Sequence, residues 1–349
     1  DISICKNSVK VRPSKLIAKD IDIVGCTSSA AICTQDGYLN KPTGYSGMML
    51  LGGDAKVVAA GSPKTNDDAR TIGRKLATKA VKEANCIEKP SYVFVSASPK
   101  EEEEYLKGIA DVIGDVPVFG GSAADNTVEG KWSIFYNDTV YNDGVVAAFF
   151  YTGKDITTVY TGAYKETKDM GIITKLNSVR VLAEIDGEPA LDKYKKWRGL
   201  KDEDVTGGNL LVTTITSPLG VKDRLGNLVA IRHPMNGNED KSMNIGANLA
   251  EGTAIIRMEA SVDELIKSVP ETLKELKKKC PNAGAYLLVH CGGRRLGIGD
   301  RMNEVYEALK KEAGDVPFIT TFTFGEYGYA DDQANTTGGL MLSFTAFEK

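Results

Sequence analysis

The chain has 349 residues, of which 42% are hydrophobic and 26% charged, the proportions of a globular protein with a full core. This length exceeds what one core normally supports, so two domains or two coupled halves are expected. The 43 basic and 47 acidic side chains leave a net charge of -4 with interleaved signs, which disfavours nucleic acid or an anionic membrane as a partner.

The remaining composition also argues against membrane insertion and metal binding. The longest apolar runs, residues 145–151 and 283–289, are far shorter than the ~20 residues that span a bilayer. The six cysteines show neither CxxC nor zinc-ligand spacing, and two histidines are too few for a conventional His-based metal site. We therefore expect reduced thiols, a cytoplasmic location, no membrane insertion, no metal and no cofactor.

Short β-branched or apolar runs predict strands, and amphipathic runs between them predict helices. The predicted strands include residues 21–24, 91–96, 144–150, 210–215, 252–258 and 285–290. One helix is predicted over residues 66–85 and another over 262–279, where Ser261 and Glu264 form a capping-box pattern. Pro270 should kink or split the second helix. This alternation predicts an α/β fold with mixed sheets flanked by helices.

An internal repeat divides the chain. Gly114-Asp115-Val116-Pro117 recurs as Gly314-Asp315-Val316-Pro317, each after an amphipathic helix and before a strand that ends in a glycine-containing turn. The repeat predicts two homologous halves, residues 1–191 and 192–349, with 192–208 as their connection. If the halves are related by a pseudo-twofold axis, the two glycine turns converge and a ligand cleft lies between them.

The most informative motif follows the predicted strand 285–290. There, Cys291, Gly292 and Arg294 combine a thiol, a flexible backbone and a guanidinium at the carboxyl end of a strand, where ligands of α/β sheets tend to bind. Glycine lets backbone N–H groups approach an anion, and arginine grips a carboxylate with two bonds. This pattern indicates an anionic ligand group; the alternative is a tight turn with a packing thiol.

A second turn, after the repeated strand, places Glu326 beside Gly325. A carboxylate there would accept bonds from an ammonium group or orient Arg294, unless it is an exposed turn residue. In the first half, the corresponding turn contains Gly120, Gly121, Ser122 and Asp125, and an earlier turn contains Cys26 and Thr27. We expect these residues to line the same cleft, although a plain polar turn also explains Cys26 and Thr27.

Several enzyme and cofactor patterns are absent from the sequence. Neither a Walker phosphate loop nor a dinucleotide fingerprint follows a predicted strand, so nucleotide binding is disfavoured. Adjacent strand residues point to opposite faces, so His290 and Cys291 would not form a catalytic dyad within a strand. No catalytic motif is identified, and a thiol enzyme that uses Cys291 stays an alternative.

These segments, taken in order, resemble the FIST family, with both its N-terminal and C-terminal parts. The resemblance covers most of the chain and is carried by Ile23-Val24-Gly25-Cys26-Thr27-Ser28, residues 116–125, residues 184–191 with Tyr194, Pro218-Leu219-Gly220, Arg232, Glu251-Gly252, Cys291 with Arg294, and Gly325-Glu326 followed by Asn335-Thr336-Thr337. Family members usually carry a further helix and strand before the first turn, so residues 1–20 are expected to be a truncated start.

The resemblance implies a sensory domain that binds a small ligand, with amino-acid-like ligands suggested, and that signals through a protein partner. It implies no established enzymatic activity. Arg294 would hold the ligand carboxylate, Glu326 the ammonium group, and Cys291 would add a polar contact. Some relatives sense nitric oxide through haem, but Ala334 stands where relatives often have a histidine, which disfavours that second alternative. Neither the ligand nor the oligomeric state follows from the sequence.

Overall fold

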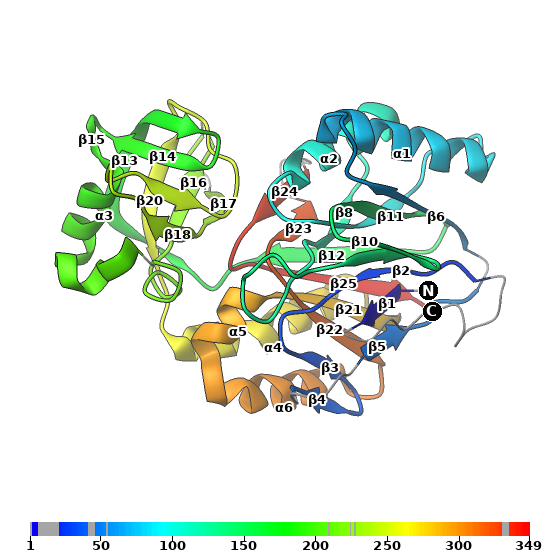
Figure 1. The fold of residues 1–349 in the computed structure, drawn as a ribbon. Helices are drawn as coiled ribbons and strands as arrows, with labels where there is room; N and C mark the ends of the chain where they lie inside the picture. Colours follow the sequence, from blue (N-terminus) through cyan, green and yellow to red (C-terminus); the bar gives the residue numbers. More distant parts are fainter. Residues whose placement is uncertain are drawn as a thin grey trace.

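The computed structural model describes residues 2–5, 21–40, 46–53, 55–208, 210–223, 225–226, 228–329 and 335–349. Of the expected truncated start, only β1 is among these residues, and Ala334 lies outside them. The chain has a mixed α/β fold in which a body of stacked sheets and helices carries a separate lobe, drawn on the left in Figure 1.

The first six-stranded sheet of the body has the order β24-β23-β8-β7-β11-β6. Its strands are β6 (Lys56–Pro63), β7 (Tyr92–Ala97), β8 (Val118–Gly121), β11 (Gly144–Tyr151), β23 (Glu326–Tyr329) and β24 (Asn335–Gly338). One face is covered by α1 (Ala69–Ala84) and α2 (Glu102–Ile113), which bury their apolar sides against it. Because β7 and β11 are buried on both faces, their sequences are almost continuously apolar.

The second six-stranded sheet has the order β12-β25-β21-β22-β3-β4. Its strands are β3 (Ile32–Thr34), β4 (Gly37–Leu39), β12 (Ile156–Thr161), β21 (Ala283–Cys291), β22 (Phe318–Thr323) and β25 (Leu342–Glu348). The associated helices are α4 (Val262–Lys279), α5 (Gly292–Ile298), η3 (Gly299–Arg301) and α6 (Met302–Ala313). The core beneath them includes Leu265, Leu273 and Phe344.

The two six-stranded sheets share one plan. In each, a parallel pair (β7 with β8, β21 with β22) is joined by an antiparallel strand (β11 or β25) to an edge strand (β6 or β12). Each sheet is then extended by a hairpin from the other part of the chain, because β23–β24 adds to β8 and β3–β4 adds to β22. Phe94, Phe119, Leu287 and Ile319 fill the layer between the sheets.

The remaining strands form a five-stranded and an eight-stranded sheet. The five-stranded sheet contains β1 (Ile2–Cys5), β2 (Val24–Cys26), β5 (Ser46–Met49), β9 (Ile134–Tyr136) and β10 (Thr139–Tyr141). The lobe contains β13 (Lys165–Ser178), β14 (Val181–Ile185), β15 (Glu188–Pro189), α3 (Ala190–Arg198), η2 (Asp202–Gly208), β16 (Leu219–Lys222), β17 (Leu228–Arg232), β18 (Pro234–Gly237), β19 (Met243–Ile245) and β20 (Ala254–Glu259). This lobe was not predicted from the sequence.

Two predictions from the sequence, the connection 192–208 and the strand 210–215, differ from the structure of the lobe. The expected connection 192–208 contains most of helix α3 and then η2, both part of the lobe. The predicted strand 210–215 is wrong: these residues form turns, because the Thr214 hydroxyl donates to Pro234 O (2.9 Å) and the Tyr164 hydroxyl donates to Ile215 O (2.8 Å).

The structure confirms the two predicted helices, α1 and α4, and agrees closely with their predicted boundaries. Asp68 caps α1 through the Thr71 N–H, and Ser261 with Glu264 forms the complete capping box of α4. Helix α4 is not split at Pro270 but continues to Lys279. Burial of its apolar side, which includes Leu265, Val269 and Leu273, offsets the loss of one helical hydrogen bond. None of the helices in the described part of the chain is long and apolar enough to cross a bilayer.

Candidate functional site

The carboxyl ends of β8, β21 and β22 meet β23 at a buried junction of the two sheets. Backbone pairing places Glu326 opposite Gly121, and Ser122 N–H donates to Gly325 O (2.8 Å). The Ser122 and Tyr327 hydroxyls are 2.8 Å apart. The two glycine-containing turns that the sequence predicted to converge are therefore in direct contact.

Glycine is required at the end of β8, where this strand reaches the junction. Gly120 has a φ of +133°, and a Cβ built there would lie 1.9 Å from Val95 O. A Cβ on Gly121 would lie 2.7 Å from Gly325 O. A larger residue at either position would push the strands apart, so these glycines are explained by close backbone approach.

Cys291, Arg294 and Glu326 lie together at the junction, and we call these three residues the junction cluster. Cys291 ends β21 and caps α5, and its Sγ accepts the N–H groups of Gly293 and Leu340, both at 3.3 Å. Its thiol also hydrogen-bonds to Glu326. The three residues that the sequence analysis placed first are thus neighbours in space.

Glu326 is held by a complete set of neutral donors. Its Oε1 accepts the Thr323 hydroxyl at 2.8 Å, and its Oε2 accepts the Met341 N–H at 3.0 Å. Burial raises the pKa of the Glu326 carboxyl from its ordinary 4.5 to about 8, although these hydrogen bonds and the Arg294 charge oppose the rise. The carboxyl is therefore mainly protonated at pH 7.

Arg294 is fully buried, yet its guanidinium has only neutral partners. Nη2 donates to Leu265 O (3.0 Å) and to the Ser268 hydroxyl (2.6 Å), and Nη1 donates to Leu340 O (3.4 Å). Its Nε has no hydrogen-bond partner in the part of the chain that the structure describes. Among the described residues, neither Arg294 nor Glu326 takes part in an ion pair, so two ionisable side chains are buried without a counter-ion.

The segment Leu340–Met341 closes the cluster, and sequence reasoning missed it. Leu340 has a φ of +58°, a strained conformation for a residue other than glycine. Its N–H and C=O contact Cys291 and Arg294, and the next N–H contacts Glu326. Tyr160 was also missed: its buried hydroxyl has no hydrogen-bond partner among the described residues, and Glu326 raises its pKa further than burial alone. The Gly338-Gly339 pair was the only signal in the sequence for this segment.

The other predicted site residues have varied surroundings. The Thr27 hydroxyl pairs with the Ser133 backbone, accepting its N–H at 2.9 Å, and Gly292 packs against Ser29 and Thr323. Cys26 lines a cavity of about 10 Å³ with Gly121 and Thr323, next to the junction cluster. These residues border the junction but are buried by protein contacts.

Asp125 and Asn335 are engaged with backbone groups. Asp125 is fully buried, and although burial alone would raise its pKa, bonds from the backbone N–H groups of residues 127–129 and of Lys131 hold the pKa below its usual value. Asn335 accepts the Val118 N–H at 2.8 Å and donates to Val116 O at 2.9 Å, which extends the edge of β8. Both side chains therefore stabilise the turns beside the cluster.

Cys291 and both histidines are buried. Burial and Glu326 raise the pKa of the Cys291 thiol well above its ordinary value, so the thiol is protonated. Burial and the Arg294 charge lower the pKa of His290 to about 3, and burial lowers that of His233 to about 4. One ring nitrogen of each histidine lies 2.9 Å from a backbone carbonyl oxygen, Cys291 O for His290 and Leu211 O for His233. The two rings are therefore neutral.

Comparison with known proteins now adds to this geometry. Residues 14–188 match the model of the FIST N domain, and residues 190–329 match the model of the FIST C domain. The chain belongs to the FIST family. FIST domains are assigned to sensing and signalling. In this FIST protein, the boundary between the two matched regions falls inside the lobe, directly before α3.

One curated relative is an uncharacterized protein of Methanocaldococcus jannaschii. The two sequences are 23% identical over 278 residues, which are 73% of this chain and 51% of the relative. The FIST chain thus spans about half the length of the relative that it matches.

Proposed function

We propose that this FIST protein is a sensor that binds a small, amino-acid-like ligand at the junction cluster, between two halves of common origin. The observation that carries the proposal is the burial of Arg294 and Glu326 without counter-ions. A buried charge without a partner costs several kcal/mol, roughly, so a ligand carboxylate would compensate the Arg294 guanidinium, and a ligand ammonium group would favour ionisation of the neighbouring Glu326 carboxyl. The ligand carboxylate takes the place of Leu340 O on Arg294, and the ammonium group approaches Glu326.

The shared plan of the two six-stranded sheets supports the idea of duplicated halves. Both contain the same parallel pair, antiparallel strand and edge strand, and the Gly-Asp-Val-Pro repeat directly precedes β8 in one and β22 in the other. A duplication with a division near Asp192 accounts for both observations. The ligand then lies where the two copies meet.

Access to the cluster requires movement of the segment Leu340–Met341, which covers all three residues. The strained φ of Leu340 lowers the cost of that movement, because a rearranged segment relieves the strain. The lobe contacts the same region: Arg232 Nη1 donates to Thr337 O (2.9 Å), and Arg180 pairs with Glu102 (3.0 Å). Ligand binding would therefore alter the contact between lobe and body, a change that a protein partner can detect.

Titration calorimetry with a panel of amino acids tests this function. We expect at least one to bind the wild-type protein, and Arg294→Met and Glu326→Gln each to weaken it by about tenfold or more, which is about 1.4 kcal/mol. Arg301→Ala is the control, since Arg301 is exposed and pairs with Glu304 and Asp263. Equal affinity in the wild type and both cluster variants, with intact circular dichroism spectra, would refute the assignment.

The raised pKa of Glu326 adds a second signature. An ammonium group favours the ionised carboxylate, so binding at pH 7 releases a proton, and the affinity rises as the pH increases toward about 8. Calorimetry in two buffers of different ionisation enthalpy measures this proton. The Glu326→Gln variant should release none. Binding without proton release would place the ammonium group elsewhere.

The two alternatives receive less support. A thiol enzyme needs an accessible thiolate, whereas Cys291 is 4% exposed and its thiol has a raised pKa. A haem sensor needs an available histidine, whereas both histidines are buried with a ring nitrogen next to a carbonyl oxygen. We therefore propose neither catalysis nor haem binding, and a visible absorption spectrum of the purified protein checks the second point directly.

A further inference from the structure

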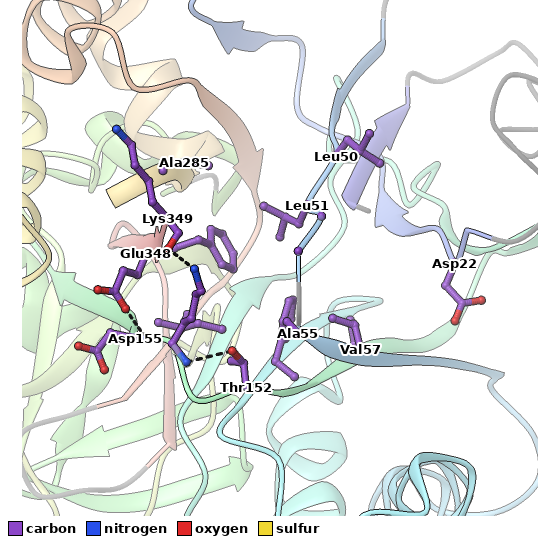
Figure 2. Close-up of a pocket in the computed structure, with 18 of the residues that line it drawn as sticks. Asp22, Leu50, Leu51, Ala55, Val57, Thr152, Asp155, Ala285, Glu348 and Lys349 are labelled. Atoms are coloured by element: carbon purple, nitrogen blue, oxygen red, sulfur yellow. Dashed lines mark hydrogen bonds between the residues drawn. The ribbon is translucent and has the colours of Figure 1, made fainter. Parts of the chain in front are cut away.

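A cavity of about 660 Å³ opens between the two six-stranded sheets, at the end opposite the junction cluster. Cys291 ends β21 and Ala285 lies near its start, while β25 begins beside Met341 and reaches the cavity at Phe347. Figure 2 shows this cavity with Ala285, Leu51 and Val57 around it. None of the candidate ligand-binding residues predicted from the sequence lines it.

The walls of the cavity are apolar and come from both sheets. The first sheet contributes Val57, Ala148 and Phe150, and the second contributes Ile156, Ala285 and Phe347. Leu50 and Leu51, which follow β5, form a third side, and Leu50 is 64% exposed. An exposed leucine beside an open apolar cavity leaves surface whose burial is favourable by about 25 cal/mol per Å².

The rim of the cavity is polar and carries both signs of charge. Lys154, Asp155 and Glu348 lie there, and none of the three forms an ion pair within the described residues. The Lys154 ammonium donates to Lys349 O, and the Glu348 carboxylate accepts the Asp155 N–H at 3.1 Å. A polar head group at the rim would therefore find a charged partner of either sign.

We propose that this cavity, the inter-sheet pocket, binds a small molecule with an aromatic or branched aliphatic body and a polar head at the rim. Its volume lies within the roughly 300–1,000 Å³ typical of small-molecule sites, and apolar walls with a few polar groups are the usual lining. The walls on three sides fit a compact molecule better than a helix or strand of another protein. This site is separate from the junction cluster and does not depend on the ligand proposed there.

Two fluorescent dyes test the pocket in the full-length chain. Anilinonaphthalene sulfonate has an anionic head and N-phenylnaphthylamine is neutral, so together they separate the contribution of the apolar body from that of the head. We expect saturable binding of both. Ala285→Trp fills the pocket from a partly exposed wall position and should weaken both dyes about tenfold or more.

Two controls separate this proposal from simpler explanations. Ile87→Trp adds the same side chain at a fully exposed position outside the pocket and should leave dye binding unchanged. Arg294→Met should also leave it unchanged, which distinguishes this pocket from the junction cluster. Circular dichroism excludes unfolded protein as the source of dye fluorescence. Absence of saturable binding to the folded wild type, or equal affinity in Ala285→Trp, would overturn the proposal.

Discussion

The two parallel strand pairs of the body have the same position in their sheets but different chemistry at their carboxyl ends. The pair β7 and β8 ends in small residues, Ser96, Gly120 and Gly121, whereas β21 and β22 end beside Cys291, Arg294 and Glu326. The small residues allow the carboxyl ends of the two strand pairs to come into contact. The ionisable side chains of the junction cluster are buried where the strand pairs meet. Within this shared plan, therefore, the β7–β8 pair provides close contact, and the β21–β22 pair ends beside the ionisable side chains.

The largest expected effect on stability comes from a substitution that prevents the close backbone approach at Gly120. In Gly120→Ala, the new Cβ would clash with Val95 O, at 1.9 Å, on a backbone with a positive φ. We expect the free energy of unfolding to fall by about 3 kcal/mol or more, measured by urea denaturation. Gly153→Ala is the control, because nothing lies within 4 Å of its Cβ position. Equal stability of the two variants would mean that close approach is not required at Gly120.

An intermediate effect on stability, at each pH unit, is expected from the buried carboxyl of Glu326. The pKa of Glu326 is raised from 4.5 to about 8 in the folded protein, so the folded state holds a proton that the unfolded state has lost between these values. Relative to a variant without this carboxyl, the wild type should therefore lose stability as the pH rises through this range, by at most about 1.4 kcal/mol per unit, and the difference should level off above about 8. Denaturation at several pH values measures this slope.

Glu326→Gln should remove that slope, since glutamine does not titrate. Glu307→Gln, at an exposed position on α6, is the matched control and should retain the slope of the wild type. If Glu326→Gln and the wild type show the same pH dependence, Glu326 is ionised in the folded protein. The junction cluster would then contain a charge that the present geometry does not compensate.

The smallest effect concerns the rate of a chemical reaction rather than stability. Cys291 is 4% exposed with a protonated thiol, whereas Cys86 is partly exposed at the end of α1. Iodoacetamide should label Cys86 well before Cys291 at neutral pH, as followed by peptide mass spectrometry. Rapid labelling of Cys291 in mild acid would instead indicate a reactive thiolate and support the thiol-enzyme alternative.

The parts of the fold that depend on local patterns were predictable from the sequence. Helices α1 and α4 follow from apolar spacing and their caps, and the repeated Gly-Asp-Val-Pro located the two turns that meet. For the site, the proximity of Cys291, Arg294 and Glu326 followed from their positions at strand ends. Their function as ligand-binding residues stays a prediction.

The parts that depend on distant pairing were not predictable. The lobe includes short strands such as β15 and β19, whose partners are fixed only by the folded sheet. Residues 210–215 have the composition of a strand, yet bonds from Thr214 and Tyr164 hold them in turns. The inter-sheet pocket is lined by ordinary core residues such as Ala148 and Phe347, which carry no motif. Only their shared position around one cavity identifies them.

The exchange of hairpins between the two sheets has a consequence for synthesis and folding. Ile32 in β3 pairs with Thr321 in β22, so the β3–β4 hairpin reaches its place only after β22 has left the ribosome. Likewise, β8 keeps an unpaired edge until β23 is made. Neither half can be completed alone, so a gene cut between them would yield fragments that must assemble with each other before either is protected from aggregation.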